Sequence, residues 1–251
     1  MQKHYLILLC FFPTLLFSQN MGPWEIGGGV HLTSYEGDLH APDINYLMKD
    51  AMVAFSGHVR RKAGNNVALR FNLLAGQIAG ADKSFTDPAW RQIRAASFKS
   101  PIVEGTLIAE CYPFGLVDEE RIMIKKGSGR PGHFSPFVAI GIGGAYSKPT
   151  VNWNDANGNP EIDPALAQMD KNAKTKQVHF VLPFGGGLRY SASKRLNIYL
   201  EGMLRPTFSD YLDGFSQAGN SNKKDWFFTV GIGIGYTIGA PQPFYDNPSV
   251  H

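Results

Sequence analysis

At 251 residues, the chain is long enough for one large domain or two small ones. Its net charge is +3, with both signs spread along the sequence and no basic stripe, which argues against a nucleic-acid-binding protein. A slightly negative mean hydropathy (−0.17) and 28 glycines argue against a helical membrane protein but suit a barrel, in which only every second strand residue faces lipid.

The N-terminal residues have the pattern of a secretory signal sequence. An apolar run covers 5–17, and the small residue Ser18 suits cleavage before Gln19. The run is too short to cross a bilayer as a helix. We therefore expect residues 1–18 to be a signal peptide that is removed on export. Cys111 is then the one remaining cysteine, so we expect no internal disulfide.

Eight segments alternate between large apolar residues and polar or small ones. Side chains of a β-strand point to opposite faces with a period of two, so each segment predicts a strand with one apolar face. The segments cover 24–35, 51–61, 67–77, 101–114, 138–146, 177–190, 196–205 and 226–239. Eight is an even number, and each segment can cross a bilayer when tilted. This predicts an all-β fold, an eight-stranded antiparallel up-and-down transmembrane β-barrel.

The connections between these segments alternate in length. Outer-membrane barrels have short periplasmic turns and long external loops. Here the links at 62–66 and 191–195 are short, whereas long loops are expected at about 36–50, 78–99, 147–176 and 206–224. The link at 115–134 is an exception, because it is long and falls on the periplasmic side. We expect the barrel domain to cover 19–239, followed by a short periplasmic tail at 240–251.

Charged residues fall on the polar face of the predicted strands. An eight-stranded barrel is filled by side chains, and unpaired buried charge is costly, so these groups should pair with one another. We expect a structural plug of ion pairs rather than a pore or an active site. A soluble barrel is the alternative, but it would turn rows of glycine outward. The predicted lumen residues are Glu25, His31, His58, Arg60, Arg70, Glu104, Glu110, His179, Arg189, Glu201 and Arg205.

Three sequence features suggest chemistry, and each has a simpler interpretation. The glycine motifs at 141–144 and 231–235 lie inside alternating strands rather than before a helix, so they do not indicate a dinucleotide cofactor. The oxygen-rich segment 155–163 lacks the glycine and glutamate that an EF-hand requires, which favours a polar turn. The lumen histidines lie near glutamates but accompany no nucleophile signature. We expect no enzyme activity, no cofactor and no metal.

Six segments together resemble one family in order and spacing. They are IGGGVHLTSYEGDL (26–39), SFKSPIVE (97–104), SPFVAIGIG (135–143), PFGGGLRY (183–190), RPTFSDYLDGFS (205–216) and KKDWFFTVGIGIGY (223–236). The family is that of the small outer-membrane barrels that include PorG, a component of the type IX secretion system. YEGDL, FSDYLD and DW are its most specific elements. The resemblance implies an outer-membrane barrel with no known enzymatic activity. In the secretion-system members, it also implies association with a periplasmic ring of partner proteins.

The charged link at 115–134 is the first place to expect a periplasmic contact, and the tail at 240–251 is the second. The equal alternative is that the link at 115–134 is an exposed loop that contacts no partner. The candidate contact residues are Asp118, Glu119, Glu120, Arg121, Lys125, Lys126 and Arg130.

Two acidic, aromatic segments close the external ends of the first and seventh strands. In a closed barrel the eighth strand lies between these two, so the segments should meet and order the external mouth. Alternatively, their aspartates only satisfy loop backbone groups as Asx turns. The spacing does not indicate a metal site. The candidate rim residues are Tyr35, Asp38, Phe208, Asp210, Tyr211 and Asp213.

The sequence thus predicts a non-enzymatic outer-membrane barrel, a component or accessory of the type IX secretion machinery. Its expected partners are outer-membrane lipid and periplasmic secretion proteins, with no nucleic acid and no small-molecule substrate. A general structural or adhesion barrel is the first alternative, and a lipid-modifying outer-membrane enzyme is the second.

Overall fold

The computed structural model describes residues 23–39, 48–64, 66–114, 116, 133–153, 159–173, 177–193, 195–219 and 224–238. The predicted signal sequence at 1–18, the tail at 240–251 and the candidate contact residues from Asp118 to Arg130 lie outside the described residues.

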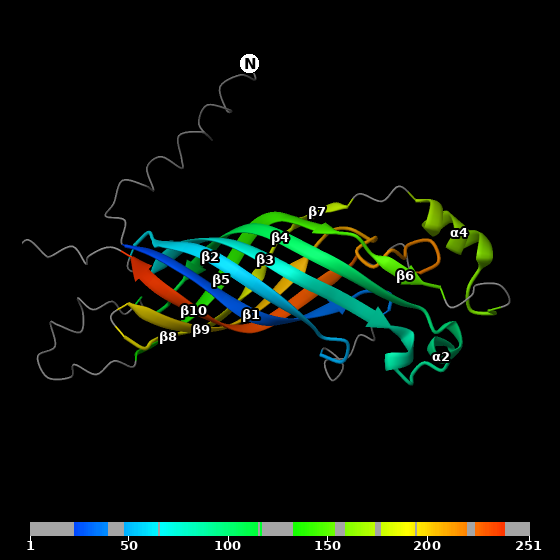
Figure 1. The fold of residues 1–251 in the computed structure, drawn as a ribbon, viewed down its shortest axis with the longest axis horizontal. Coiled ribbons are helices and arrows are strands. Elements are labelled where there is room, and N and C mark those ends of the chain that lie inside the picture. The colour runs from blue at the N-terminus through cyan, green and yellow to red at the C-terminus, as the bar shows by residue number, and fades with distance from the viewer. Residues whose placement is uncertain are drawn as a thin grey trace, which may run out of the picture.

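The described strands form a closed antiparallel β-barrel (Figure 1). They are β1 (Trp24–Glu36), β2 (Met52–Lys62), β3 (Val67–Ala81), β4 (Ser97–Cys111), β5 (His133–Ser147), β6 (Thr150–Asn152), β7 (Val178–Val181), β8 (Phe184–Ser191), β9 (Leu196–Pro206) and β10 (Trp226–Ile238). Pairing of β1 with β10 and of β4 with β5 closes the cylinder. The turn from β2 to β3 and the turn from β8 to β9 lie at one end, which we call the short-turn end. The opposite end is the long-loop end.

The predicted eight-stranded barrel is confirmed, with local differences. The predicted strand at 177–190 is divided into β7 and β8, which both pair with β5. The division falls at Pro183, which has no N–H to donate to a strand ladder. The strand β6 is a short addition that pairs with the start of β4 at the long-loop end. The β3–β4 hairpin is longer than predicted, because its pairing continues to Ala81 and Ser97.

Short helices in the long loops were not predicted. They are η2 (Asp82–Ser84), α2 (Trp90–Arg94) and α4 (Pro164–Asn172), and Figure 1 shows α2 and α4 at the long-loop end. The helix α4 begins in a recognisable way, since the Asp163 carboxylate accepts a hydrogen bond from Ala165 N at 2.8 Å and proline occupies the first turn. No helix in the described part of the chain combines the length and the apolar character needed to cross a membrane.

The outer surface of the barrel wall is apolar. Each of the eight barrel strands, with β7 and β8 counted as one, turns at least one large apolar side chain outward, with an exposed fraction of 49–64%. Examples, one per strand, are Val30, Phe55, Phe71, Leu107, Ile140, Phe180, Leu200 and Ile232. The neighbouring residues in each strand point inward, so the predicted alternation of faces holds around the cylinder; most of them are polar or small, but some, such as Ile108 and Val181, are large and apolar.

Glycines of β10 make room for larger side chains of β1 inside the barrel. A Cβ atom on Gly235 would lie 2.5 Å from Glu25 Oε1, and one on Gly231 would lie 2.2 Å from His31 Nδ1. Real Cβ atoms do not approach other atoms so closely. The small inner face of β10 is therefore required by what the neighbouring strand places in the lumen.

Two apolar clusters lie inside the barrel. The cluster at the long-loop end includes Tyr35, Phe98, Leu212, Phe215 and Phe227. The cluster at the short-turn side includes Ala68, Ile108, Tyr112, Leu116, Phe137 and Met203. Buried charges lie beside the cluster at the short-turn side, since Glu110 is directly opposite Ala68 in the β3–β4 pairing.

Candidate functional site

All eleven predicted lumen residues point into the barrel. None is more than 7% exposed: Glu25, His31, His58, Arg60, Arg70, Glu104, Glu110, His179, Arg189, Glu201 and Arg205. They come from β1, β2, β3, β4, β7, β8 and β9. The set contains four glutamates and four arginines, so its formal charges cancel when the histidines are neutral.

Five of these residues form a chain of alternating charges across the lumen. Arg60 Nη1 lies 2.7 Å from Glu25 Oε1, and Arg60 Nε lies 2.9 Å from Glu110 Oε2. Arg70 Nε lies 3.0 Å from the other oxygen of Glu110. Arg70 Nη1 donates to Glu201 Oε2 at 2.7 Å. Each arginine of this chain therefore has two acidic partners, and the chain links strands on different sides of the barrel.

Neutral polar side chains complete this network. Tyr112 Oη donates to Glu110 Oε2 at 2.7 Å, and Asn197 Nδ2 donates to Glu25 Oε2 at 2.7 Å. The Tyr199 hydroxyl also contacts Glu25, and its ring lies 4.1 Å from the Arg60 guanidinium. The sequence analysis did not single out these three residues. Asn197 and Tyr199 share the inward face of β9 with Glu201, so the alternation would have found them had uncharged groups been considered.

Glu104 and Arg205 form a separate ion pair nearer the long-loop end. The Arg205 Nε atom lies 2.7 Å from Glu104 Oε2. Arg205 Nη1 also donates to the Met203 carbonyl oxygen at 3.2 Å and to the Thr229 hydroxyl. Among the described residues, Glu104 is the acidic partner of this arginine. The pair thus depends on a single contact between opposite charges.

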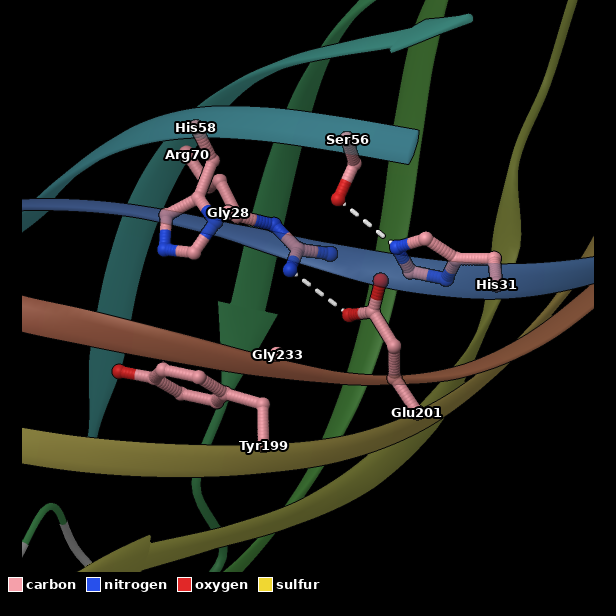
Figure 2. A pocket seen from close by; sticks show the side chains of 8 residues that line it. All are labelled: Gly28, His31, Ser56, His58, Arg70, Tyr199, Glu201 and Gly233. Atoms are coloured by element: carbon pink, nitrogen blue, oxygen red, sulfur yellow. Dashed lines mark hydrogen bonds and ion pairs between the residues drawn. The ribbon is translucent and has the colours of Figure 1, made fainter. Parts of the chain in front are cut away.

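Two of the lumen histidines pair with serine hydroxyls. His31 Nε2 lies 2.7 Å from Ser56 Oγ, and His179 Nε2 lies 2.8 Å from Ser147 Oγ. Figure 2 shows the Ser56 hydroxyl directed at the His31 ring, with the Glu201 carboxylate between His31 and Arg70. The cavity that these side chains line has a volume of about 10 Å³, roughly that of one water molecule. There is no room here for an organic substrate.

The rim residue Tyr35 connects the predicted rim segments. Its hydroxyl lies 2.5 Å from Asp213 Oδ2 and 3.0 Å from Asp225 Oδ1, and it accepts a hydrogen bond from the backbone N–H of Asp38 at 2.8 Å. The structure therefore brings the 35–39 and 208–213 segments together. Sequence analysis missed Asp225, although it directly precedes β10 and belongs to the DW element.

The two rim carboxyls both lie within hydrogen-bonding distance of the Tyr35 hydroxyl. A single hydroxyl proton cannot be donated to both acids at once, and neither acid is exposed to water. Burial, reinforced by the negative charge of Asp225, raises the pKa of Asp213 well above its usual range. Burial, reinforced by Asp38, raises the pKa of Asp225 to about 7. Because the folded rim holds protons more tightly than the unfolded chain, it contributes most stability below about pH 4 and loses that contribution as the pH rises through about 7.

The other predicted rim residues have different environments. Phe208 does not join the contact, since it is 58% exposed and its ring lies against Phe180 on the outside. Its backbone has a positive φ of 55°, which turns the chain there. Asp210 is buried, and burial raises its pKa. Asp213 also accepts from Phe215 N at 2.8 Å, so the Asx-turn interpretation holds at this aspartate as well. The Tyr211 hydroxyl lies 3.5 Å from Asp170 Oδ1.

Two further aspartates order the long loops, and the sequence analysis singled out neither. Asp170 of α4 accepts hydrogen bonds from the backbone N–H groups of 216–218, at 2.9–3.2 Å. Asp82 is fully buried and binds Arg94 through two hydrogen bonds of 2.6 and 2.7 Å. Arg94 Nη2 in turn donates to the Asp38 carbonyl oxygen at 3.1 Å. The loops at this end are therefore tied to each other and to β1.

Within the described ranges, no group of three or more histidine, cysteine, aspartate or glutamate side chains is arranged to hold a metal ion. The acidic groups in this part of the chain form ion pairs and hydrogen bonds with other side chains.

The fold and the lumen define a closed eight-stranded barrel with an apolar outside and a charge-paired inside. No family model matches the chain, and no curated protein matches it. Solved barrels similar to it include Ail, the attachment invasion locus protein of Yersinia pestis, at 12% identity and a TM-score of 0.41, over 86% of this chain and 99% of that chain. Neisserial surface protein A is similar at 8% identity and a TM-score of 0.45, over 88% and 100%. OprG from Pseudomonas aeruginosa is similar at 12% identity and a TM-score of 0.42, over 87% and 97%.

Proposed function

We propose that this protein is a non-enzymatic barrel of the bacterial outer membrane and a component or accessory of the type IX protein secretion machinery. The observation that carries the membrane assignment is the two-sided wall. Every strand of the barrel wall exposes large apolar side chains on the outside, whereas the charged lumen residues are buried inside. An apolar surface of this extent would be unfavourable in water, but in lipid it is the favoured surface.

The filled lumen supports a structural role rather than conduction. The alternating chain from Glu25 to Glu201 crosses the interior, and the cavity beside it holds about one water molecule. A solute that passed through would have to break these ion pairs, and a buried charge that loses its partner costs about 3–5 kcal/mol. The barrel therefore acts through its two ends.

An enzymatic role is the alternative that the Ser56–His31 pair brings forward. A serine nucleophile needs a base that is itself oriented by a third group. Among the described residues, His31 Nδ1 has no hydrogen-bond partner, so no carboxylate orients the ring. The adjoining cavity of about 10 Å³ also leaves no space for a lipid chain. Both observations support the non-enzymatic proposal.

The secretion role rests on the sequence resemblance to the PorG-like barrels. The three most specific elements of that resemblance supply Tyr35, Asp213 and Asp225, and these three side chains contact one another at the long-loop end. The three motifs therefore meet in one hydrogen-bonded contact at the rim of the barrel, although they are far apart in the sequence. Contact with periplasmic partners would involve the opposite, short-turn end.

Deletion of the gene followed by an assay of type IX cargo in the medium tests the secretion role. We expect cargo to accumulate in the cells and to be released again on complementation with the wild-type chain. Normal cargo secretion in the deletion strain would refute the secretion role and leave the structural or adhesion barrel. Mass spectrometry of outer-membrane lipid incubated with the purified protein tests the enzyme alternative, for which we expect no change in lipid mass.

Membrane insertion as a closed barrel has its own test. We expect the protein extracted from outer membranes in detergent to migrate differently on gels before and after boiling. Identical migration of the two samples would contradict a closed barrel, whatever the outcome of the secretion assay. Crosslinking and pull-down from native envelopes would then identify the partners at the short-turn end.

A further inference from the structure

A second cavity opens at the short-turn end of the barrel. Its volume is about 40 Å³, enough for roughly three water molecules. Arg60, Arg189 and Lys62 contribute three cationic side chains to its lining, and Glu25 contributes one carboxylate. Cationic side chains therefore outnumber acidic ones in the lining of this cavity.

Arg189 has an unused donor in this wall. The residue is 7% exposed, and its Nε donates to Tyr199 Oη at 3.2 Å. Its Nη2 lies 3.6 Å from Glu25 Oε2, which is a loose ion pair. Its buried Nη1 has no hydrogen-bond partner among the described residues. Buried donors are nearly always satisfied, so an exception of this kind indicates a missing acceptor.

Glu25 does not supply that acceptor in this structure, because both of its oxygens bond to other groups. Oε1 pairs with Arg60 at 2.7 Å and lies 3.5 Å from His58 Nε2. Oε2 accepts a hydrogen bond from Asn197 at 2.7 Å. Arg60 has a second partner in Glu110, whereas the acid near Arg189 is the shared Glu25. The charge of Arg189 is thus the least compensated of the four lumen arginines.

We propose that this cavity is an anion site that binds one oxyanion the size of a phosphate group. The Arg189 guanidinium is the inner donor, because guanidinium groups bind phosphate and carboxylate oxygens through strong charge-assisted hydrogen bonds. Lys62, half-buried at the end of β2, is the outer cation. The site requires the folded barrel but not the secretion role, so the two proposals can fail separately.

Calorimetric titration of the full folded chain in detergent with inorganic phosphate tests the site. Sodium chloride at the same ionic strength is the reference titrant, and sodium acetate shows whether a carboxylate suffices. We expect saturable binding of phosphate that chloride does not reproduce. Equal heats for phosphate and chloride would overturn the proposal.

Three variants locate the site. Arg189→Gln should weaken phosphate binding about tenfold or more, because a charge-assisted hydrogen bond is lost. Lys62→Gln should weaken it severalfold. Lys99→Gln removes the same charge from an exposed position at the opposite end of the barrel and should leave binding unchanged. Unchanged binding in Arg189→Gln, or equal weakening by Lys62→Gln and Lys99→Gln, would refute the site. If Arg189→Gln lacks the folded form on gels, the comparison of the two lysine variants decides the question.

Discussion

Neutralising Glu104 should destabilise the barrel more than its small chemical change suggests. Glu104 and Arg205 are both completely or almost completely buried, and their charged atoms are 2.7 Å apart. At an effective dielectric constant of about 20, the attraction at this distance is about 6 kcal/mol, part of which is offset by desolvation. In Glu104→Gln, Arg205 keeps two neutral acceptors but no acidic partner, so we expect a loss of about 3–5 kcal/mol.

The double variant Glu104→Gln with Arg205→Met separates the pair from its surroundings. Since no uncompensated charge remains, the double variant should lose clearly less stability than the sum of the two single losses. Glu161→Gln, an exposed change in the loop before α4, serves as the control and should stay within about 0.5 kcal/mol of wild type. Urea unfolding in lipid vesicles, followed by tryptophan fluorescence and gel migration, measures the two single variants, the double variant, the control and the wild type. A Glu104→Gln loss below about 1 kcal/mol, or strictly additive losses, would refute the account of the lumen as a plug of ion pairs.

Three further predictions concern the wall, the rim and the outer surface. Gly235→Val should cost about 1–3 kcal/mol or more in the same urea assay, because its side chain meets Glu25. Gly57→Val should cost little, because its Cβ would make one ordinary contact, 4.0 Å from the Gly27 carbonyl oxygen. Equal losses would contradict the close fit. The melting temperature of the wild type should fall as the pH rises from about 4 to about 7. Asp225→Asn, which mimics the protonated acid, should reduce this slope and be at least as stable as wild type at pH 8. An unchanged slope would argue against the raised pKa of Asp225. Ile232→Arg should destabilise the barrel in vesicles by about 2–4 kcal/mol if this residue faces lipid, and a near-neutral result would favour a soluble barrel.

The alternation of residues was sufficient to predict which side of each strand faces the lumen. It assigns a residue to a face without knowledge of its partner, because the side-chain period of a strand is exactly two. This explains why all eleven charged residues lie where they were expected. It also explains the prediction that Tyr35 and Asp213 would be close, although they are 178 residues apart, since strand order alone places their segments at one part of the rim.

The partners inside the lumen could not be predicted in this way. Arg70 binds Glu201 from a strand that is not its neighbour, across 131 residues of sequence. Which charges meet depends on the height of each residue along the barrel axis, and that height is set by strand tilt and register once the sheet closes. Asp170 was missed for a related reason, since its backbone partners at 216–218 belong to another loop. The start of α4 was available in the sequence, because an aspartate followed by proline is a common helix start.

The two ends of the barrel hold different buried polar groups. At the long-loop end, Tyr35, which belongs to a cluster of aromatic and aliphatic side chains, hydrogen-bonds to Asp213 and Asp225, and Asp82 ties the neighbouring loop to Arg94. This end of the barrel is suited to presenting a fixed surface. A movement of its loops would expose Asp213 and Asp225 to water, and the pKa values of both acids depend on their burial. At the short-turn end, Arg189 keeps a donor without an acceptor in the described structure. A buried donor in that state gains most from a group that arrives from outside, so the short-turn end is where ligand chemistry should be sought first.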